Sequence, residues 1–93
     1  MHAKALEFSS AEIARYYRFR VPALKQLPDR EFWRGPCPIH AGTRDSFAVN
    51  PKTGWFRCFS ECDRGGSIFD LERELTGVGR ATAIMNILRI LGR

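Results

Sequence analysis

The apolar and polar residues follow a helical repeat at both ends of the chain and a period of two in its middle. The first helix is predicted over residues 9–19. Ser9 and Glu12 have the spacing of a capping box, and Phe8 and Ile13 have the spacing of a hydrophobic staple across the same helix start. Pro22 lacks the amide proton that a longer helix would need, so the helix should end before it.

The middle of the chain predicts a β-hairpin. Residues 46–50 alternate between polar and apolar, residues 51–54 (PKTG) are turn formers, and residues 55–59 are rich in aromatic side chains. A short strand is also predicted over 31–34. In the 55–59 strand, a period of two places Trp55, Arg57 and Phe59 on the face opposite Phe56 and Cys58.

Two further helices are predicted after this hairpin, over 67–76 and 80–91. Ser67 and Asp70 form a second capping box, and Gly77 ends the first of these helices. The second is expected to turn one apolar stripe toward the ribbon. That stripe consists of Ile84, Ile87, Leu88 and Leu91.

The composition is that of one small folded domain spanning residues 1–93. Of its 93 residues, 44% are hydrophobic and 12% aromatic, as in ordinary globular proteins. A chain of this length buries a smaller fraction of its surface than a larger one, so a metal staple would help it to fold. The predicted fold class is α+β, a small antiparallel β-hairpin sheet flanked by one N-terminal and two C-terminal helices.

The positive charge is concentrated in the first two thirds of the chain. Between Arg15 and Arg57 there are nine Lys and Arg residues against three Asp and Glu residues, and the net charge of the chain is +5. This excess favours a polyanionic partner, although a solvated basic surface would have the same composition.

The three cysteines cannot all pair with one another, and the first residues (MHAKALEFSSAE) contain no apolar run of a signal peptide. The apolar stretches are also far shorter than the roughly 20 residues that span a bilayer. We therefore expect a cytoplasmic protein without a membrane segment, in which reduced thiols are able to bind metal.

Two short cysteine and histidine motifs predict a zinc site over residues 37–62. Cys37 and His40 are separated by two residues, and Cys58 and Cys62 by three, which is the spacing of paired zinc ligands on tight turns. The seventeen residues between the pairs leave room for a strand of the hairpin. The alternative is that the cysteines are small buried apolar residues and His40 a surface side chain. His2 has no paired neighbour and is a poor ligand candidate.

Four protein ligands would close the shell of one Zn²⁺ ion, so the metal is predicted to be structural and the metal-free chain to be partly or wholly unfolded. No phosphate-binding loop, catalytic triad or Mg²⁺-binding carboxylate cluster is recognisable. The nearest acidic group is explained as surface charge of a helix. It comprises Asp63, Asp70, Glu72 and Glu74. No catalytic site is therefore predicted in this chain.

Four motifs in this order resemble the Cys-His-Cys-Cys zinc-binding domain of bacterial, phage and plasmid DNA primases. They are residues 37–40 (CPIH), 45–49 (DSFAV), 55–59 (WFRCF) and 65–70 (GGSIFD). The resemblance covers about residues 9–91. One departure is the second cysteine pair, where the family usually has two intervening residues and this chain has three. This departure favours a diverged or mobile-element relative.

In that family the domain precedes a primer-synthesising domain and helps to recognise the single-stranded template at initiation. The resemblance thus implies either the N-terminal domain of a primase or a stand-alone relative that makes no primers by itself. It implies single-stranded DNA as a partner, together with a primase catalytic domain, a helicase or a polymerase.

Single strands bind to basic side chains that follow the phosphates and to aromatic faces on which bases stack. Trp55 and Arg57 are the principal candidates, although core packing would equally account for a tryptophan at position 55. Neighbouring segments add Trp33, Arg34, Arg44 and Lys52. Two other functions remain open: a ribbon that docks a helicase or polymerase, and a small zinc transcription regulator that binds duplex DNA.

Overall fold

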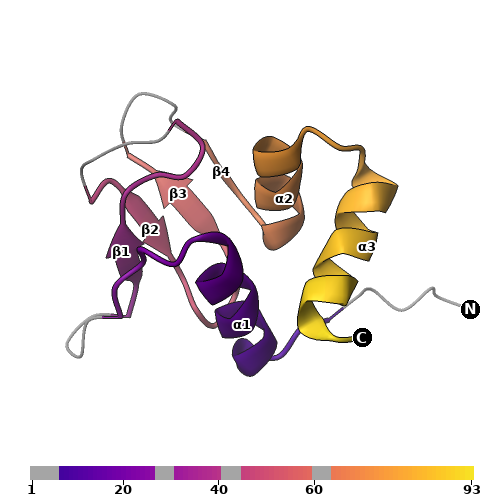
Figure 1. The fold of residues 1–93 in the computed structure, drawn as a ribbon. Helices are drawn as coiled ribbons and strands as arrows, with labels where there is room; N and C mark the ends of the chain where they lie inside the picture. Colours follow the sequence, from indigo (N-terminus) through magenta and orange to yellow (C-terminus); the bar gives the residue numbers. More distant parts are fainter. Residues whose placement is uncertain (1–6, 27–30, 41–44, 60–63) are drawn as a thin grey trace, which may run out of the picture.

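The computed structural model of the chain describes residues 7–26, 31–40, 45–59 and 64–93. It contains three helices and four strands. In chain order these are α1 (Ser10–Arg20), β1 (Trp33–Gly35), β2 (Phe47–Val49), β3 (Phe56–Cys58), β4 (Gly65–Gly66), α2 (Ile68–Thr76) and α3 (Arg80–Leu91). Figure 1 shows the sheet at one end of the molecule and α3 at the other, with α1 and α2 between them. The predicted α+β fold class is confirmed.

The strands form one antiparallel sheet in the order β1-β2-β3-β4. The predicted hairpin is confirmed as β2 and β3, in which Ala48 is opposite Arg57. The predicted strand at 31–34 is observed slightly later, as β1. Strand β4 was not predicted, because a glycine pair has weak strand propensity and was interpreted as a turn into the next helix.

The capping boxes decide where α1 and α2 begin. The hydroxyl of Ser9 accepts a hydrogen bond from the amide of Glu12, and the Glu12 carboxylate accepts one from the amide of Ser9. Ser67 and Asp70 repeat this arrangement before α2, and Gly77 follows α2 with φ 72°. The helices therefore start one residue after the predicted bounds, because each serine is the cap and lies outside the helix.

The core lies between α1, the sheet and the two C-terminal helices. Tyr16 and Tyr17 of α1 are fully buried, and the hydroxyl of Tyr17 donates a 2.6 Å hydrogen bond to the carbonyl of Gly54. The predicted apolar stripe of α3 was partly wrong. Ala83, Ile87 and Leu91 are buried, whereas Ile84 and Leu88 are partly exposed. Helix α3 packs on α1 and α2 rather than on the sheet, so a different face is covered.

A buried carboxylate joins all three helices. Glu72 on α2 is 0% exposed. Tyr16 and the Nε atom of Arg20 donate hydrogen bonds to its Oε1 atom at 3.0 and 2.7 Å, while Arg20 Nη2 and Asn86 donate to Oε2 at 2.5 and 3.1 Å. The expectation that Glu72 belongs to the surface charge of a helix was wrong, because α1 and α3 cover this part of α2.

The hydrogen bonds to Glu72 decide its protonation state. Burial by itself would raise the pKa of Glu72, but the hydrogen bonds from Arg20 and Tyr16 outweigh it and the pKa is lowered. Burial, followed by the neighbouring charge of Glu72, raises the pKa of Tyr16 far above its usual range. The carboxylate therefore stays ionised and the phenol stays protonated at neutral pH.

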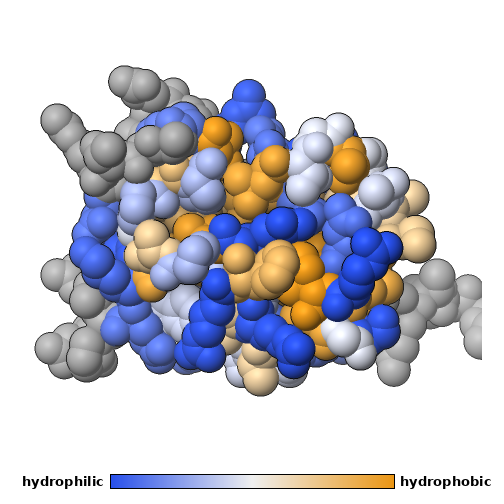
Figure 2. Space-filling model, in the orientation of Figure 1, coloured by the Kyte–Doolittle hydropathy of each residue, from blue (hydrophilic) through white to orange (hydrophobic). Residues whose placement is uncertain are grey.

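Hydrophilic side chains are spread over the face seen in Figure 2, with smaller apolar areas between them. Within the described ranges, no helix is both long and apolar enough to cross a membrane.

Candidate metal centre and nucleic-acid interface

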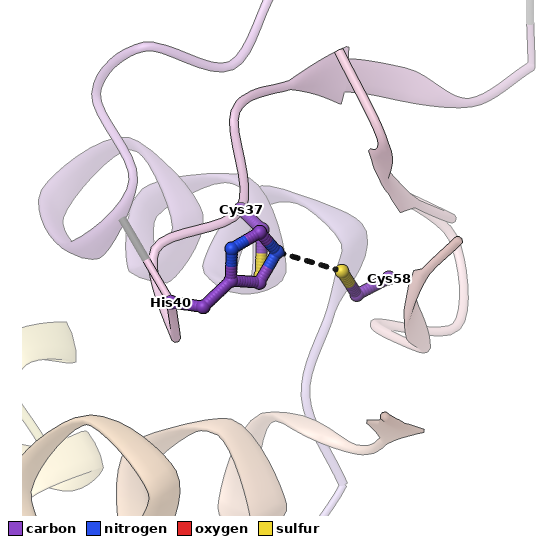
Figure 3. A group of neighbouring side chains, drawn as sticks. All are labelled: Cys37, His40 and Cys58. Carbon is purple, nitrogen blue, oxygen red and sulfur yellow. Dashed lines mark hydrogen bonds between the residues drawn. The ribbon is translucent and has the colours of Figure 1, made fainter. Parts of the chain in front are cut away.

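Three of the four predicted zinc ligands come together at one end of the sheet. Cys37 and His40 follow β1, and Cys58 is the last residue of β3. Their ligand atoms all lie within 4.8 Å of one another, and Cys58 Sγ is 3.4 Å from His40 Nε2. Figure 3 shows the three side chains converging on one point. Residues that are 18 to 21 positions apart in the chain are thus brought together by the antiparallel pairing of the sheet.

This geometry fits a zinc ion. With Zn–S and Zn–N bonds of about 2.3 and 2.1 Å, ligand atoms at the corners of a tetrahedron are about 3.6 Å apart, close to the separation of Cys58 Sγ and His40 Nε2. Cys37 is 1% exposed and Cys58 0% exposed, while His40 is partly exposed. Cys62, the fourth predicted ligand, lies outside the described residues. The three that are described, two buried cysteines and a partly exposed histidine, are a set of the kind that holds structural zinc.

The outer face of the sheet carries a row of three residues from three strands. Arg34 of β1, Ala48 of β2 and Arg57 of β3 are directly opposite one another, so their side chains lie on the same face. Ala48, at the centre of the row, is only 8% exposed. Two positive side chains therefore flank a small, buried side chain.

A groove of about 590 Å³ follows this row. Its lining residues are Phe32, Arg34, Ala48, Asn50, Thr53, Trp55, Phe56, Arg57 and Phe59. We call it the sheet groove. Phe32, Trp55 and Phe59 are 45%, 58% and 64% exposed, which is high for large apolar side chains. The predicted alternation in β3 is confirmed, because Phe56 and Cys58 are buried on the opposite face.

The ring of Phe59 lies close to the guanidinium groups of both arginines in the row. The guanidinium carbons of Arg34 and Arg57 lie 5.8 and 5.9 Å from the centre of its ring, within cation–π distance. Arg34 also donates a 2.8 Å hydrogen bond to the carbonyl of Asp45, and its Nε atom is buried without a partner among the described residues. The sheet groove thus presents exposed rings next to oriented guanidinium groups.

Glycine at position 65 makes room for Arg57. A Cβ atom there would lie 3.2 Å from Arg57 Cδ and 3.0 Å from the carbonyl of Phe56. At Gly66 a Cβ atom would be 2.5 Å from the carboxylate of Asp70, which caps α2. The glycine pair therefore allows β4 to lie close to Arg57 and to the start of α2 at the same time.

The structure separates the other residues that were predicted to join this face. Trp33 is 6% exposed and points to the opposite side of the sheet from Arg34, so the expectation that it belongs to the exposed face was wrong. Lys52 lines a different groove, and Arg44 lies outside the described residues. Phe59 and Phe32 were not among the predicted contacts. The period of two in β3 had already placed Phe59 on this face.

Comparison with known families supports the metal centre. Residues 9–92 match the family of CHC2 zinc fingers of primases. The chain belongs to this family. The match includes the three helices and the whole sheet, so the flanking helices are part of the CHC2 zinc finger. The predicted resemblance is confirmed.

One relative of this CHC2 zinc finger is a DNA primase of Borreliella burgdorferi. The two are 40% identical over 45 residues, which make up 48% of this chain and 8% of the relative. The chain thus spans a small fraction of the length of the relative that it matches. The similarity connects this chain to a non-catalytic zinc-binding module of primases.

Proposed function

We propose that this CHC2 zinc finger binds one structural Zn²⁺ ion through Cys37, His40, Cys58 and Cys62. The close approach of the first three ligand atoms supports this proposal, and Cys62 is the remaining cysteine of the chain. When bound, the ion would tie the loop after β1 to the end of β3. The proposal places the domain in the cytoplasm, where thiols are kept reduced.

We further propose that the domain recognises single-stranded template DNA during primer initiation. The observation that carries this function is the sheet groove, in which exposed Trp55 and Phe59 rings lie beside Arg34 and Arg57. Unpaired bases offer flat faces for such rings, whereas the bases of a duplex are stacked inside it. The chain itself is proposed to bind template without polymerising nucleotides, and a primase catalytic domain would be its partner.

The test is a comparison of single-stranded and double-stranded DNA. Zinc-loaded protein should bind a labelled single strand more tightly than the same sequence as a duplex, measured by fluorescence anisotropy. With about four phosphate contacts, the logarithm of the affinity should fall against the logarithm of salt concentration with a slope of about −3, because each contact on a single strand contributes about −0.7.

Equal affinity for the two forms would contradict template recognition. In that case the exposed aromatic residues of the sheet groove would favour the second candidate, a ribbon that docks a helicase or polymerase through Phe32, Trp55 and Phe59. A preference for duplex together with dimer formation would instead favour a transcription regulator.

A further inference from the structure

A second groove lies on the other side of strand β1, between α1 and the β2–β3 turn. Its volume is about 410 Å³, and Ser10, Ala11, Ala14, Arg18, Gln26, Trp33, Pro51 and Lys52 line it. We call it the helix groove. Four of these residues belong to α1, and the two alanines leave the middle of this wall without long side chains. Its two cationic residues come from different elements, Arg18 from α1 and Lys52 from the turn.

The two cations of the helix groove are available to a ligand. Arg18 and Lys52 are both exposed, and none of the ion pairs between described side chains includes either of them. The acidic residue of α1, Glu12, caps the helix and pairs with Arg93. The positive charge of Arg18 and Lys52 is therefore not neutralised within the described part of the chain.

The floor of the helix groove positions one of these cations. The guanidinium carbon of Arg18 lies 5.5 Å from the ring centre of Trp33, within cation–π distance. Because Trp33 is 6% exposed, its ring supports Arg18 but offers no free face for stacking a base. The helix groove thus presents oriented charge without an aromatic platform, whereas the sheet groove presents both.

The two grooves share their walls. In the β2–β3 turn, Asn50 and Thr53 line the sheet groove, and Pro51 and Lys52 line the helix groove. Neighbouring residues of β1 also line different grooves, since Arg34 faces the sheet groove and Trp33 faces the helix groove. Backbone hydrogen bonds between Lys25 and Arg34 cover the outer edge of β1. The turn at residues 50–54 is therefore the connection between the grooves.

We propose that the helix groove is a second binding site for the sugar-phosphate backbone of the same single strand, which passes from the sheet groove around the β2–β3 turn. This inference rests on the proposed function and extends it. Arg18 and Lys52 would each contact a phosphate, and the lack of a stacking platform makes this part of the site indifferent to base identity. Two of about four phosphate contacts would come from each groove.

The experiment compares oligothymidylates of about 4 and about 16 nucleotides, lengths at the two ends of the usual range for single-strand binding sites. Affinity is measured by anisotropy at several salt concentrations for the wild type and for the double variant Arg18→Gln/Lys52→Gln. For the long strand, the salt slope should become shallower by about 1.4, and affinity at about 0.1 M salt should fall about 25-fold. The short strand, held in the sheet groove, should bind both proteins equally.

Arg80→Gln is the matched control, because Arg80 is an exposed arginine at the start of α3, at the end of the molecule away from the sheet (Figure 1). It should leave both measurements unchanged. Lys52→Gln alone should lower the long-strand slope by about 0.7 and leaves the Arg18–Trp33 contact intact. Zinc content and melting temperature are measured for each variant.

An unchanged slope for the long strand in the double variant would overturn the helix groove as a nucleic-acid site while leaving the sheet groove in place. A loss in Arg80→Gln as large as that in Lys52→Gln would overturn it as well, since the effect would then reflect net charge alone. If the wild-type protein bound neither strand, the proposed function itself would be wrong. An acidic protein segment would then be the remaining class of ligand for Arg18 and Lys52.

Discussion

At the scale of single residues, the sheet groove separates two kinds of contribution to DNA binding. Trp55 is an exposed ring without a charge just before β3, and Arg57 is a cation in β3 two residues later. Stacking does not release counterions, whereas a phosphate contact does. The two side chains should therefore affect the salt dependence of binding differently.

We expect Arg57→Ala to lower the affinity for single-stranded DNA and to make the salt slope shallower by about 0.7. Trp55→Ala should weaken binding by about 1 to 3 kcal/mol without a change in slope. Fluorescence anisotropy over a range of salt concentrations measures both effects. Met85→Ala removes an exposed apolar side chain of α3, outside both grooves, and serves as the control for loss of a large exposed side chain. Full affinity in both folded variants would exclude the sheet groove as the binding face.

At the scale of the helices, Glu72 is the fully buried charged side chain among the described residues. Charged side chains are rarely fully buried unless they are paired. Here the carboxylate accepts hydrogen bonds from two residues of α1 and one of α3. Removing its charge leaves Arg20 without its charged partner, and the Arg20 side chain is only 27% exposed.

The variant Glu72→Gln should lower the unfolding free energy by about 3 kcal/mol at neutral pH, the lower end of the range for buried pairs because Arg20 retains some access to water. In a domain of this size this corresponds to a melting temperature lower by about 12 to 24 °C. The matched control is Glu74→Gln on the same helix. It removes a partly exposed pair with Arg64 and should cost less than about 1 kcal/mol.

The pH dependence of this difference follows from the lowered pKa of Glu72. A carboxyl group with a lowered pKa stabilises the folded state fully above its unfolded value, near 4.5, and loses this contribution as the pH falls toward the folded value. The gap in melting temperature between the wild type and Glu72→Gln should thus be constant from pH 7 to about 5. It should narrow below about 4.5, with excess zinc present throughout. A difference in melting temperature that disappears between pH 7 and 5 would contradict a lowered pKa for Glu72.

At the scale of the whole molecule, the sheet is too small to explain a stable fold by itself. Its longest strands have three residues, and three of the predicted zinc ligands lie in the loop after β1 and at the end of β3. Zinc binding in such domains contributes about 10 to 16 kcal/mol to folding, more than the total stability of many domains of this length. The metal should therefore decide whether the chain folds.

We expect the purified chain to contain one zinc per molecule, and Cys58→Ser, His40→Ala or Cys62→Ser to remove both the zinc and the cooperative thermal transition. Elemental analysis and calorimetry measure these two properties. The control is His2→Ala, which removes the other histidine of the chain and should change neither. A zinc-free sample that still melts cooperatively would show that the metal is not needed for the fold.

The sequence by itself determined the features that depend on neighbours within a few residues. The caps at Ser9 and Ser67, the hairpin around residues 50–54 and the alternation in β3 were all predictable, because each depends on local hydrogen bonds or on side-chain period. The grouping of Cys37, His40 and Cys58 was predictable from their spacing, since Cys37 and His40 belong to one turn and Cys58 lies in a predicted strand of the hairpin.

The tertiary structure alone decided which charged and aromatic residues are buried. Glu72 is buried because its hydrogen-bond donors come from positions as far as 56 residues away, and no local pattern contains that information. Trp33 and Arg34 are adjacent and equally suited to an exposed face by composition, yet the pairing of β1 with β2 places one in the core and the other in the sheet groove. The division of the basic residues between two grooves has the same cause. The net charge is a property of the sequence, but packing decides which groove each basic side chain faces.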